Sequence, residues 1–255
     1  MARWRPKMIG VLLVAMLLLA GCAASGISPQ DQKRADALRN LGEAYLREGN
    51  YTAALGELLK AKELNPDDPI LHNNLGLAYM ARERVDLAVV HFEKAVQLKP
   101  DYSLAKNNLG SAYLVRKEWD KAIVPLKEVT EDLLYATPHF PLANLGWAYY
   151  NKQQYDQAQH YLQEALKLAP DFFVARLNLG RTYLATGRLH QALTLFEAAV
   201  DSHPTDPALL LELGKTYRLL GDYSNATLAL KAAIEFSKDA DLTVEASEEL
   251  KRIYR

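Results

Sequence analysis

Ser103 and Lys106 are the residues whose types and spacing come nearest to a catalytic motif. In serine acyl-enzymes a Ser-x-x-Lys pattern supplies the nucleophile, but Ser-Asp-Asn and Lys-Thr-Gly elements accompany it, and neither occurs here. The six histidines include no i, i+4 pair for zinc, and no Gly-rich nucleotide loop or Gly-x-Ser-x-Gly motif occurs. We therefore expect no catalytic activity and no metal or cofactor.

The remaining reactive side chain is the only cysteine, Cys22, which ends an N-terminal targeting segment. Basic residues precede a run of twelve uncharged residues, which is too short to cross a hydrocarbon core of about 30 Å. This pattern is typical of a secretory signal. The segment closes with Leu19-Ala20-Gly21-Cys22, which resembles a bacterial lipobox. We expect residues 1–21 to be removed and Cys22 to carry acyl chains that anchor the protein in a membrane.

The residues after Cys22 bear on where such an anchor would lie. Ala23 stands where an Asp commonly signals retention in the inner membrane, so a lipoprotein of this type would reach the periplasmic face of the outer membrane. Residues 22–34 are small and polar and predict a lipidated flexible tether. The alternative is an ordinary signal peptide with a buried hydrophobic cysteine.

Composition narrows the class of the rest of the chain. Of the 255 residues, 49% are hydrophobic and 24% are charged, as is usual in globular proteins. Thirty Lys and Arg residues oppose 31 Asp and Glu residues, so we expect no basic surface for nucleic acid.

One pattern recurs six times after the tether. A Leu-Gly pair is followed three residues later by Tyr, nine residues after that by Ala, and four residues later by Leu or Phe. The repeated glycines are Gly42, Gly76, Gly110, Gly146, Gly180 and Gly214. Their spacing is 34 residues except for one interval of 36. This pattern resembles the tetratricopeptide repeat, in which each unit is two amphipathic helices.

The resemblance implies an all-α fold, a right-handed superhelical solenoid of six repeats with a C-terminal capping helix. The predicted units are 35–68, 69–102, 103–138, 139–172, 173–206 and 207–240, and the predicted cap is 241–255. We expect Leu250, Ile253 and Tyr254 of the cap to cover the last unit. Pro125 should kink or break the second helix of the third unit. The two-residue insertion nearby is either a loop variation or a joint between the two halves.

The first helix of each unit carries a stripe that is predicted to face the concave surface of the solenoid. Its residues are apolar, aromatic or Asn, and they are Ile70, Asn73, Asn74, Leu77, Met80, Leu104, Asn107, Asn108, Ser111, Leu114, Phe140, Ala143, Asn144, Trp147, Tyr150, Leu177, Arg181 and Leu184. Such a groove suits an amphipathic helix or an extended peptide. It lacks the run of Lys and Arg that clamps carboxylates in chaperone-binding repeats. The alternative is that these side chains pack against neighbouring units, or that the asparagines bond only to backbone.

The arrangement as a whole resembles the type IV pilus pilotin lipoproteins, the PilF/PilW/Tgl family. The segments that carry this resemblance are Asn107-Asn108-Leu109-Gly110, Leu134-Tyr135-Ala136-Thr137-Pro138 and Asn144-Leu145-Gly146. The resemblance implies an outer-membrane lipoprotein that binds secretin subunits and promotes their assembly for pilus biogenesis. That family uses mainly its N-terminal repeats for this contact, which here points to Arg39, Glu43, Leu46, Asn73, Leu77 and Met80.

Two other functions stay open at this point. One is an envelope lipoprotein scaffold that organises peptidoglycan hydrolases or outer-membrane assembly. The other is a hydrolase with an unrecognised site.

Overall fold

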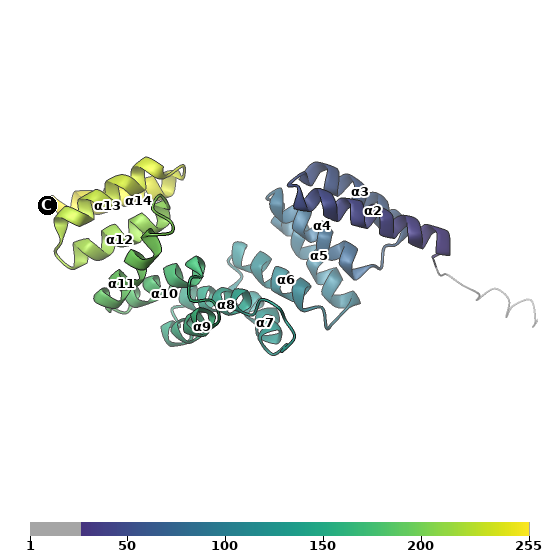
Figure 1. The fold of residues 1–255 in the computed structure, drawn as a ribbon, viewed down its shortest axis with the longest axis horizontal. Helices are drawn as coiled ribbons and strands as arrows, with labels where there is room; N and C mark the ends of the chain where they lie inside the picture. Colours follow the sequence, from purple (N-terminus) through teal and green to yellow (C-terminus); the bar gives the residue numbers. More distant parts are fainter. Residues whose placement is uncertain (1–26, 255) are drawn as a thin grey trace, which may run out of the picture.

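The computed structural model describes residues 27–254, which form thirteen α-helices and no strand (Figure 1). In chain order the helices are α2 (Pro29–Arg47), α3 (Tyr51–Leu64), α4 (Pro69–Ala81), α5 (Val85–Leu98), α6 (Ser103–Val115), α7 (Trp119–Thr130), α8 (His139–Asn151), α9 (Tyr155–Leu168), α10 (Phe173–Ala185), α11 (Leu189–Val200), α12 (Pro207–Leu219), α13 (Tyr223–Phe236) and α14 (Ala240–Ile253). The predicted signal segment, with Leu19, Ala20, Gly21 and Cys22, lies outside the described residues.

The helices pack in six successive pairs, from α2 with α3 to α12 with α13, and α14 packs on the last pair. Each pair from α4 and α5 onward falls inside the range predicted for its unit. The predicted fold class, an all-α repeat solenoid, is confirmed.

Within each pair the repeated glycine lets two helices come close. A Cβ atom placed on Gly42 would lie 2.6 Å from Cγ of Leu58, nearer than side-chain atoms approach one another. The glycines of the other five units face Leu or Phe side chains just as closely. The Leu-Gly pair and the bulky residue sixteen positions after the glycine are therefore the two halves of one contact.

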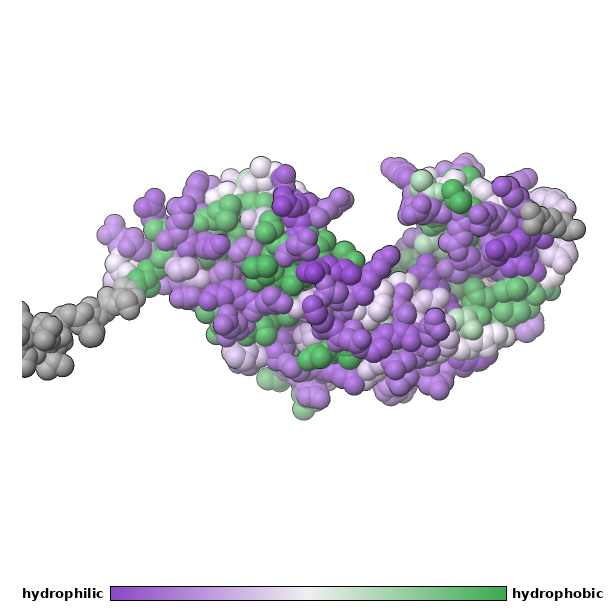
Figure 2. All heavy atoms as spheres, turned by 180° about the vertical axis from the view of Figure 1, so that it is seen from behind, coloured by the Kyte–Doolittle hydropathy of each residue, from purple (hydrophilic) through white to green (hydrophobic). Residues whose placement is uncertain are grey.

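Contacts between units curve the chain. Each first helix touches the first helix of the next unit, from α2 with α4 to α10 with α12, whereas successive second helices of the described units do not touch. The first helices therefore lie on the inside of the curve and the second helices on the outside. Two arms rise on either side of α8 in Figure 1, and Figure 2 shows the hollow between them from behind.

A single apolar core crosses the long link between the third and fourth units. The largest buried cluster joins Leu126 of α7 to Ala143 and Leu145 of α8, and it extends from α5 to α13. Smaller clusters lie between α3 and α4 and beneath α14. The two halves of the solenoid thus share a core at the link, which favours the loop variation over a joint.

The predicted tether is shorter than expected, because α2 begins at Pro29 rather than near residue 35. Ser28 is the N-cap, and its hydroxyl accepts a hydrogen bond from the backbone N–H of Asp31 at 3.0 Å. A proline at the first helical position and an acidic residue in the first turn both favour a helix start. Reading 22–34 by composition alone missed these position-specific signals.

Pro125 does not break its helix. Helix α7 runs on to Thr130, with Pro125 buried in its interior. A proline there removes one backbone hydrogen bond, but Leu126 and Val129 beside it are fully buried and hold the segment against the core. The link that follows is turned by Asp132, whose carboxylate accepts from the N–H of Leu134 at 3.0 Å.

The capping helix α14 covers the last unit with a different set of residues from that predicted. Ala246 is fully buried, and Leu242, Leu250 and Ile253 pack against the cluster beneath the helix. Tyr254 is 71% exposed, so its predicted covering role is wrong. It lies just after the last helical turn, where the chain no longer follows the packed face.

Every unit reverses direction between its helices with one residue in the left-handed conformation. The N–H three residues after the end of the first helix bonds to the carbonyl of the repeated Tyr, as from Asn50 to Tyr45 at 2.9 Å. The left-handed residue is glycine in three units and Glu83, Lys117 or Gln153 in the others, with φ near 60°.

We predict that Glu83→Gly, Lys117→Gly and Gln153→Gly will each raise the free energy of unfolding. A residue with a Cβ atom loses about 1–2 kcal/mol in this conformation, and the greater freedom of unfolded glycine cancels part of that, so the net gain should be about 0.5–1 kcal/mol. Urea denaturation followed by circular dichroism measures it. The matched control Gly187→Ala should be destabilising, and a loss of stability in all three glycine variants would contradict this account.

A buried histidine pair joins the two helices of the second unit. Nε2 of His72 donates to the carbonyl of Pro66 at 2.8 Å, so Nδ1 of His72 is free to accept from Nδ1–H of His91 at 2.9 Å. Both rings are neutral in this arrangement. Burial lowers the pKa of His72, and burial with the adjacent His72 lowers the pKa of His91 to about 4.

We predict that stability falls as the pH drops from about 6.5 toward 4. In that range the unfolded chain binds protons at these histidines and the folded chain does not, so protonation favours unfolding. Replacing His91 with Gln keeps an N–H donor but removes its titration. Between pH 7 and pH 5 the native protein should lose about 1–2 kcal/mol more than His91→Gln, measured by urea denaturation at each pH. Equal losses would show that His91 does not carry the effect.

Candidate functional site

A pocket of about 590 Å³ lies at the N-terminal end of the solenoid, among residues of the first three units. Eight of the residues predicted for the groove line it, namely Glu43, Leu46, Ile70, Asn73, Asn74, Leu77, Met80 and Leu104. The rest of its lining is Arg47, Tyr51, Ala81 and Tyr102. We call this cavity the N-terminal pocket. Its volume falls within the about 300–1,000 Å³ range of ligand pockets, and most of its lining is apolar.

Local sequence chemistry fixes the helix that supplies most of this lining. Asp68 caps α4, because its carboxylate accepts from the N–H groups of Ile70 at 2.8 Å and Leu71 at 3.2 Å. Arg39 of α2 donates to the other oxygen of Asp68 at 2.5 Å and so ties the first unit to the second. Ile70, Asn73, Asn74 and Leu77 of α4 then follow one another on one helix face.

Asparagine side chains form hydrogen bonds between neighbouring units. Asn108 donates from Nδ2 to Oδ1 of Asn73 at 2.8 Å, and Asn144 donates to the hydroxyl of Ser111 at 3.0 Å. These bonds join side chains, so the alternative that the asparagines bond only to backbone is wrong. Two buried amide atoms, Nδ2 of Asn74 and Oδ1 of Asn107, have no partner among residues 27–254.

A smaller pocket of about 220 Å³ follows further along the solenoid, between α8 and α10. Asn144, Trp147, Val174, Leu177, Asn178 and Arg181 line it. Trp147 stacks on Tyr150, with 5.4 Å between the ring centroids, and the guanidinium of Arg181 lies 5.5 Å from the Trp147 ring. We call this the central pocket.

The other residues predicted for the groove line neither pocket. They are Arg39, Asn107, Asn108, Ser111, Leu114, Phe140, Ala143, Tyr150 and Leu184. Arg39 and Asn108 are engaged between units, as described above. Leu114 is buried in the main core, against which the Trp147 and Tyr150 rings pack, so its assignment to the groove is wrong.

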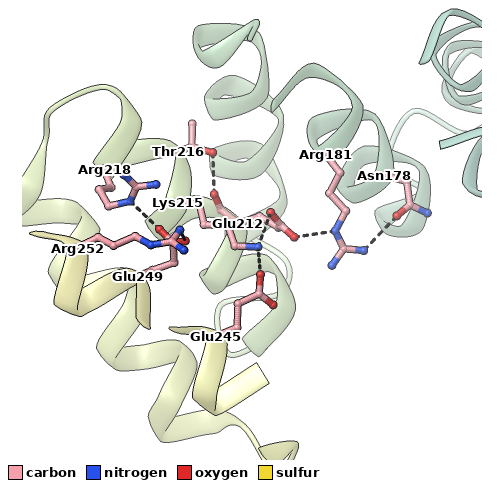
Figure 3. Close-up of polar contacts among 9 residues, drawn as sticks. All are labelled: Asn178, Arg181, Glu212, Lys215, Thr216, Arg218, Glu245, Glu249 and Arg252. Carbon is pink, nitrogen blue, oxygen red and sulfur yellow. Dashed lines mark hydrogen bonds and ion pairs between the residues drawn. The ribbon is translucent and has the colours of Figure 1, made fainter. Parts of the chain in front are cut away.

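The first helices become charged toward the C-terminal end, which the sequence reasoning did not anticipate (Figure 3). Glu212 of α12 accepts from Nε of Arg181 at 3.0 Å, and Lys215 of the same helix pairs with Glu245 of α14 at 2.6 Å. Burial alone would lower the pKa of Lys215, but Glu212 and Glu245 raise it above its usual value. Each charge therefore already has its counter-charge.

A second ion pair links the same two helices. Arg218 of α12 donates to Glu249 of α14 at 2.6 Å, and Arg252 contacts the other oxygen of Glu249. Aligning the repeats would have found the residues from α12, because Glu212, Lys215 and Arg218 occupy the repeat positions of Asn74, Leu77 and Met80.

The catalytic pattern named first in the sequence separates into two structural contacts. The hydroxyl of Ser103 donates to Asp132 at 2.5 Å, and Lys106 pairs with Glu128 at 2.5 Å. Within residues 27–254, no three His, Cys, Asp or Glu side chains are grouped so that they could hold a metal ion. In the same part of the chain, no helix combines the length and apolar character needed to cross a bilayer.

Comparison with known proteins identifies the repeat. Models of the tetratricopeptide repeat match residues 69–102, 144–207 and 177–241, and a further TPR repeat model matches residues 42–82. Together these matches cover more than half of the chain. A search of curated proteins found no match.

Solved structures share the fold at low sequence identity. PilF of Pseudomonas aeruginosa is 21% identical, with a TM-score of 0.73 over 86% of this chain and 99% of its own. PilW, a widely conserved type IV pilus biogenesis factor, is 22% identical, with a TM-score of 0.73 over 87% and 98%. YrrB, a TPR protein with an unusual peptide-binding site, is 24% identical, with a TM-score of 0.55 over 75% and 97%. The chain therefore belongs to the tetratricopeptide repeat proteins, whose repeats bind peptides or other proteins, and it has the fold of PilF and PilW.

Proposed function

We propose that the protein is an outer-membrane lipoprotein that acts as a pilotin. It binds secretin subunits of a type IV pilus system on its concave surface and promotes their targeting to the outer membrane and their assembly. The observation that carries this proposal is the likeness to PilF and PilW over 99% and 98% of their chains. That likeness extends over most of this chain and nearly all of theirs, so it is far longer than a single repeat unit.

The N-terminal pocket suits the binding step of this proposal. Leu46, Leu77 and Met80 offer an apolar lining that a partner's side chains can cover, at about 25 cal/mol for each Å² removed from water. Glu43 and Arg47 of α2 place one charge of each sign at the same pocket. A partner segment with apolar residues and a nearby charged residue would fit this lining.

The proposed lipid anchor would limit how far the N-terminal pocket can lie from the membrane. Pro29, the start of α2, is the seventh residue after Cys22. Even fully extended, seven residues reach only about 25 Å. If Cys22 is acylated, the first unit and its pocket are therefore held close to the bilayer surface, where secretin subunits would be delivered.

We predict that the double variant Leu77→Asp with Met80→Asp will abolish secretin binding. Leu77 is 36% exposed and Met80 is half-buried, so carboxylates there reach water in the free protein but become buried when a partner covers them. Binding to purified secretin should weaken by at least about 100-fold, measured by fluorescence anisotropy, while circular dichroism stays helical.

The matched control for this variant is Val90→Asp on α5. Val90 is 58% exposed and lies on a second helix, away from the pocket. It should bind secretin as the native protein does. If the pocket variant keeps native affinity while secretin still binds elsewhere, the pocket is not the contact site.

We predict that Cys22→Ala will give a folded protein that no longer fractionates with the outer membrane, since acylation needs the cysteine thiol. Secretin should then be found in the wrong membrane fraction. Fractionation with immunoblotting measures both proteins. Outer-membrane recovery of Cys22→Ala equal to that of the native protein would contradict the lipid anchor.

Deleting the gene tests the function as a whole. The pilotin proposal expects the loss of secretin multimers and of surface pili, with both restored by the native gene. Normal pili together with altered cell-wall turnover would instead favour a scaffold for peptidoglycan hydrolases. Activity of the pure protein on wall or ester substrates would favour a hydrolase.

A further inference from the structure

Two leucines in the long link between α7 and α8 lie almost wholly in water. Leu133 is 96% exposed and Leu134 is 93% exposed, whereas the next most exposed large hydrophobic residue within residues 27–254 is Tyr254, at 71%. Single exposed apolar side chains are common on protein surfaces, but these two are adjacent and make almost no contact with the rest of the fold. We call them the leucine tip. The fold gains no packing from it, which directs attention to a surface outside the chain.

Hydrogen bonds hold the link that carries the leucine tip. The carboxylate of Asp132 accepts from the backbone N–H of Leu134 at 3.0 Å and from the hydroxyl of Ser103 at 2.5 Å. The N–H of Tyr135 bonds to the carbonyl of Asp132 at 3.1 Å. Beneath the link, α7 and α8 share the main core. The tip therefore projects from a well-supported part of the solenoid.

Chain topology places the leucine tip on the same edge of the solenoid as the start of the first helix. Three residues connect the two helices of each unit, so the two run antiparallel and every first helix begins on one edge. We call this the entry edge. The link 131–138 leads into α8 there, and the chain enters α2 there through Ile27, which is 37% exposed.

The leucine tip and the start of α2 are close enough for one surface to meet both. Three steps between touching first helices lead from α2 through α4 and α6 to α8. Packed helix axes lie about 8–10 Å apart, so these steps add up to about 30 Å at most. Pro29 can be separated from Cys22 by only about 25 Å of extended chain. An acyl anchor at Cys22 would thus hold the entry edge, with its leucine tip, near the bilayer.

A lipid surface suits the leucine tip better than a protein surface does. Specific protein interfaces bury about 800 Å² on each partner, far more than two side chains provide. A bilayer needs only a weak second contact, because acyl chains at Cys22 would supply the main attachment.

Acidic residues beside the leucine tip limit what it can enter. Glu131 is exposed, and a hydrogen bond from Ser103 lowers the pKa of Asp132, which keeps that carboxylate charged. A charged group is costly to move into hydrocarbon, so only the leucines can insert. The same charges make anionic lipid headgroups less favourable than zwitterionic ones.

We propose that Leu133 and Leu134 insert into the bilayer that holds the acyl anchor, so that the entry edge of the solenoid rests on the membrane. The proposal rests on the lipid anchor of the function given above. It goes beyond that function by naming a second membrane contact and the orientation that this contact imposes. Contact through an edge leaves the concave surface uncovered for a partner.

The test uses the acylated full-length lipoprotein, verified by mass spectrometry and reconstituted into phosphatidylcholine vesicles. Cys22 is the only cysteine and its thiol would carry lipid, so a cysteine introduced by Ala136→Cys can be labelled alone with an environment-sensitive fluorophore. Ala136 is exposed in the same link. On reconstitution the emission should shift to shorter wavelength, and spin-labelled lipid should quench it.

Adding Leu133→Ser and Leu134→Ser to the labelled protein should abolish both the emission shift and the quenching. Circular dichroism and the unfolding temperature should stay unchanged, because the two leucines contribute almost no packing. A shift that persists in this variant would show that the leucines do not make the membrane contact.

Thr205→Cys, labelled in the same way, is the matched control. Thr205 is exposed in the link between α11 and α12, which lies on the entry edge two units further along and has no large exposed apolar residue. Its emission should not change on reconstitution. Vesicles that also contain phosphatidylglycerol should give no stronger response at Ala136→Cys, because acidic residues flank the leucine tip.

The outcomes separate this inference from the function on which it rests. In acylated protein, a lipid-dependent shift that needs the two leucines supports both. A label that stays in water in acylated protein overturns the membrane contact and leaves the pilotin role standing. A response without vesicles, on adding purified secretin or unlabelled copies of this chain, shows that a protein covers the tip and overturns the bilayer as its occupant. Protein found to be unacylated overturns the anchor and, with it, the premise of this inference.

Discussion

The close contact between a glycine and a bulky side chain inside each helix pair is the constraint on which the rest of the molecule depends. A Cβ atom on Gly42 would collide with Leu58, and the same holds in each later unit. The contact fixes how near the two helices lie, which fixes the shape of the unit and the angle at which the next one stacks. Because successive first helices touch and second helices spread apart, the curve and its inner surface follow from one repeated distance.

This constraint also explains which parts of the fold could be predicted. Residues that recur every 34 positions report contacts that are local to a unit, so their spacing revealed the resemblance to a known repeat, and that resemblance implied the helix pairs and the all-α solenoid. Features that occur only once in the chain were harder to predict from the sequence. The early start of α2 depends on Ser28 as a cap, and the continuity of α7 through Pro125 depends on burial against the core. Neither a composition average nor a rule about proline contains that information.

The candidate site shows the same division between local and non-local causes. Helical spacing correctly placed Leu77 and Met80 on one face, and both line the N-terminal pocket. Leu114 has the repeat position of Met80, yet it is buried, because the aromatic rings of the next unit pack over the core there. Asn74 and Asn108 are likewise the same residue at the same position. One is paired and the other is not, since the partner position is Asn73 in one case and Arg39 in the other.

A partner that binds the inner surface would therefore meet different free-energy costs at its two ends. At the C-terminal end, Glu212, Lys215 and Glu249 already hold their counter-charges, and a partner would have to replace those ion pairs with equally good ones. At the N-terminal end, a partner that entered the pocket would mainly displace water from a largely apolar lining. Under the proposed function, binding energy would therefore be concentrated in the first units. If Cys22 carries the proposed lipid, those are also the units nearest the membrane, so capture of a partner and its delivery to the bilayer would occur at the same end of the solenoid.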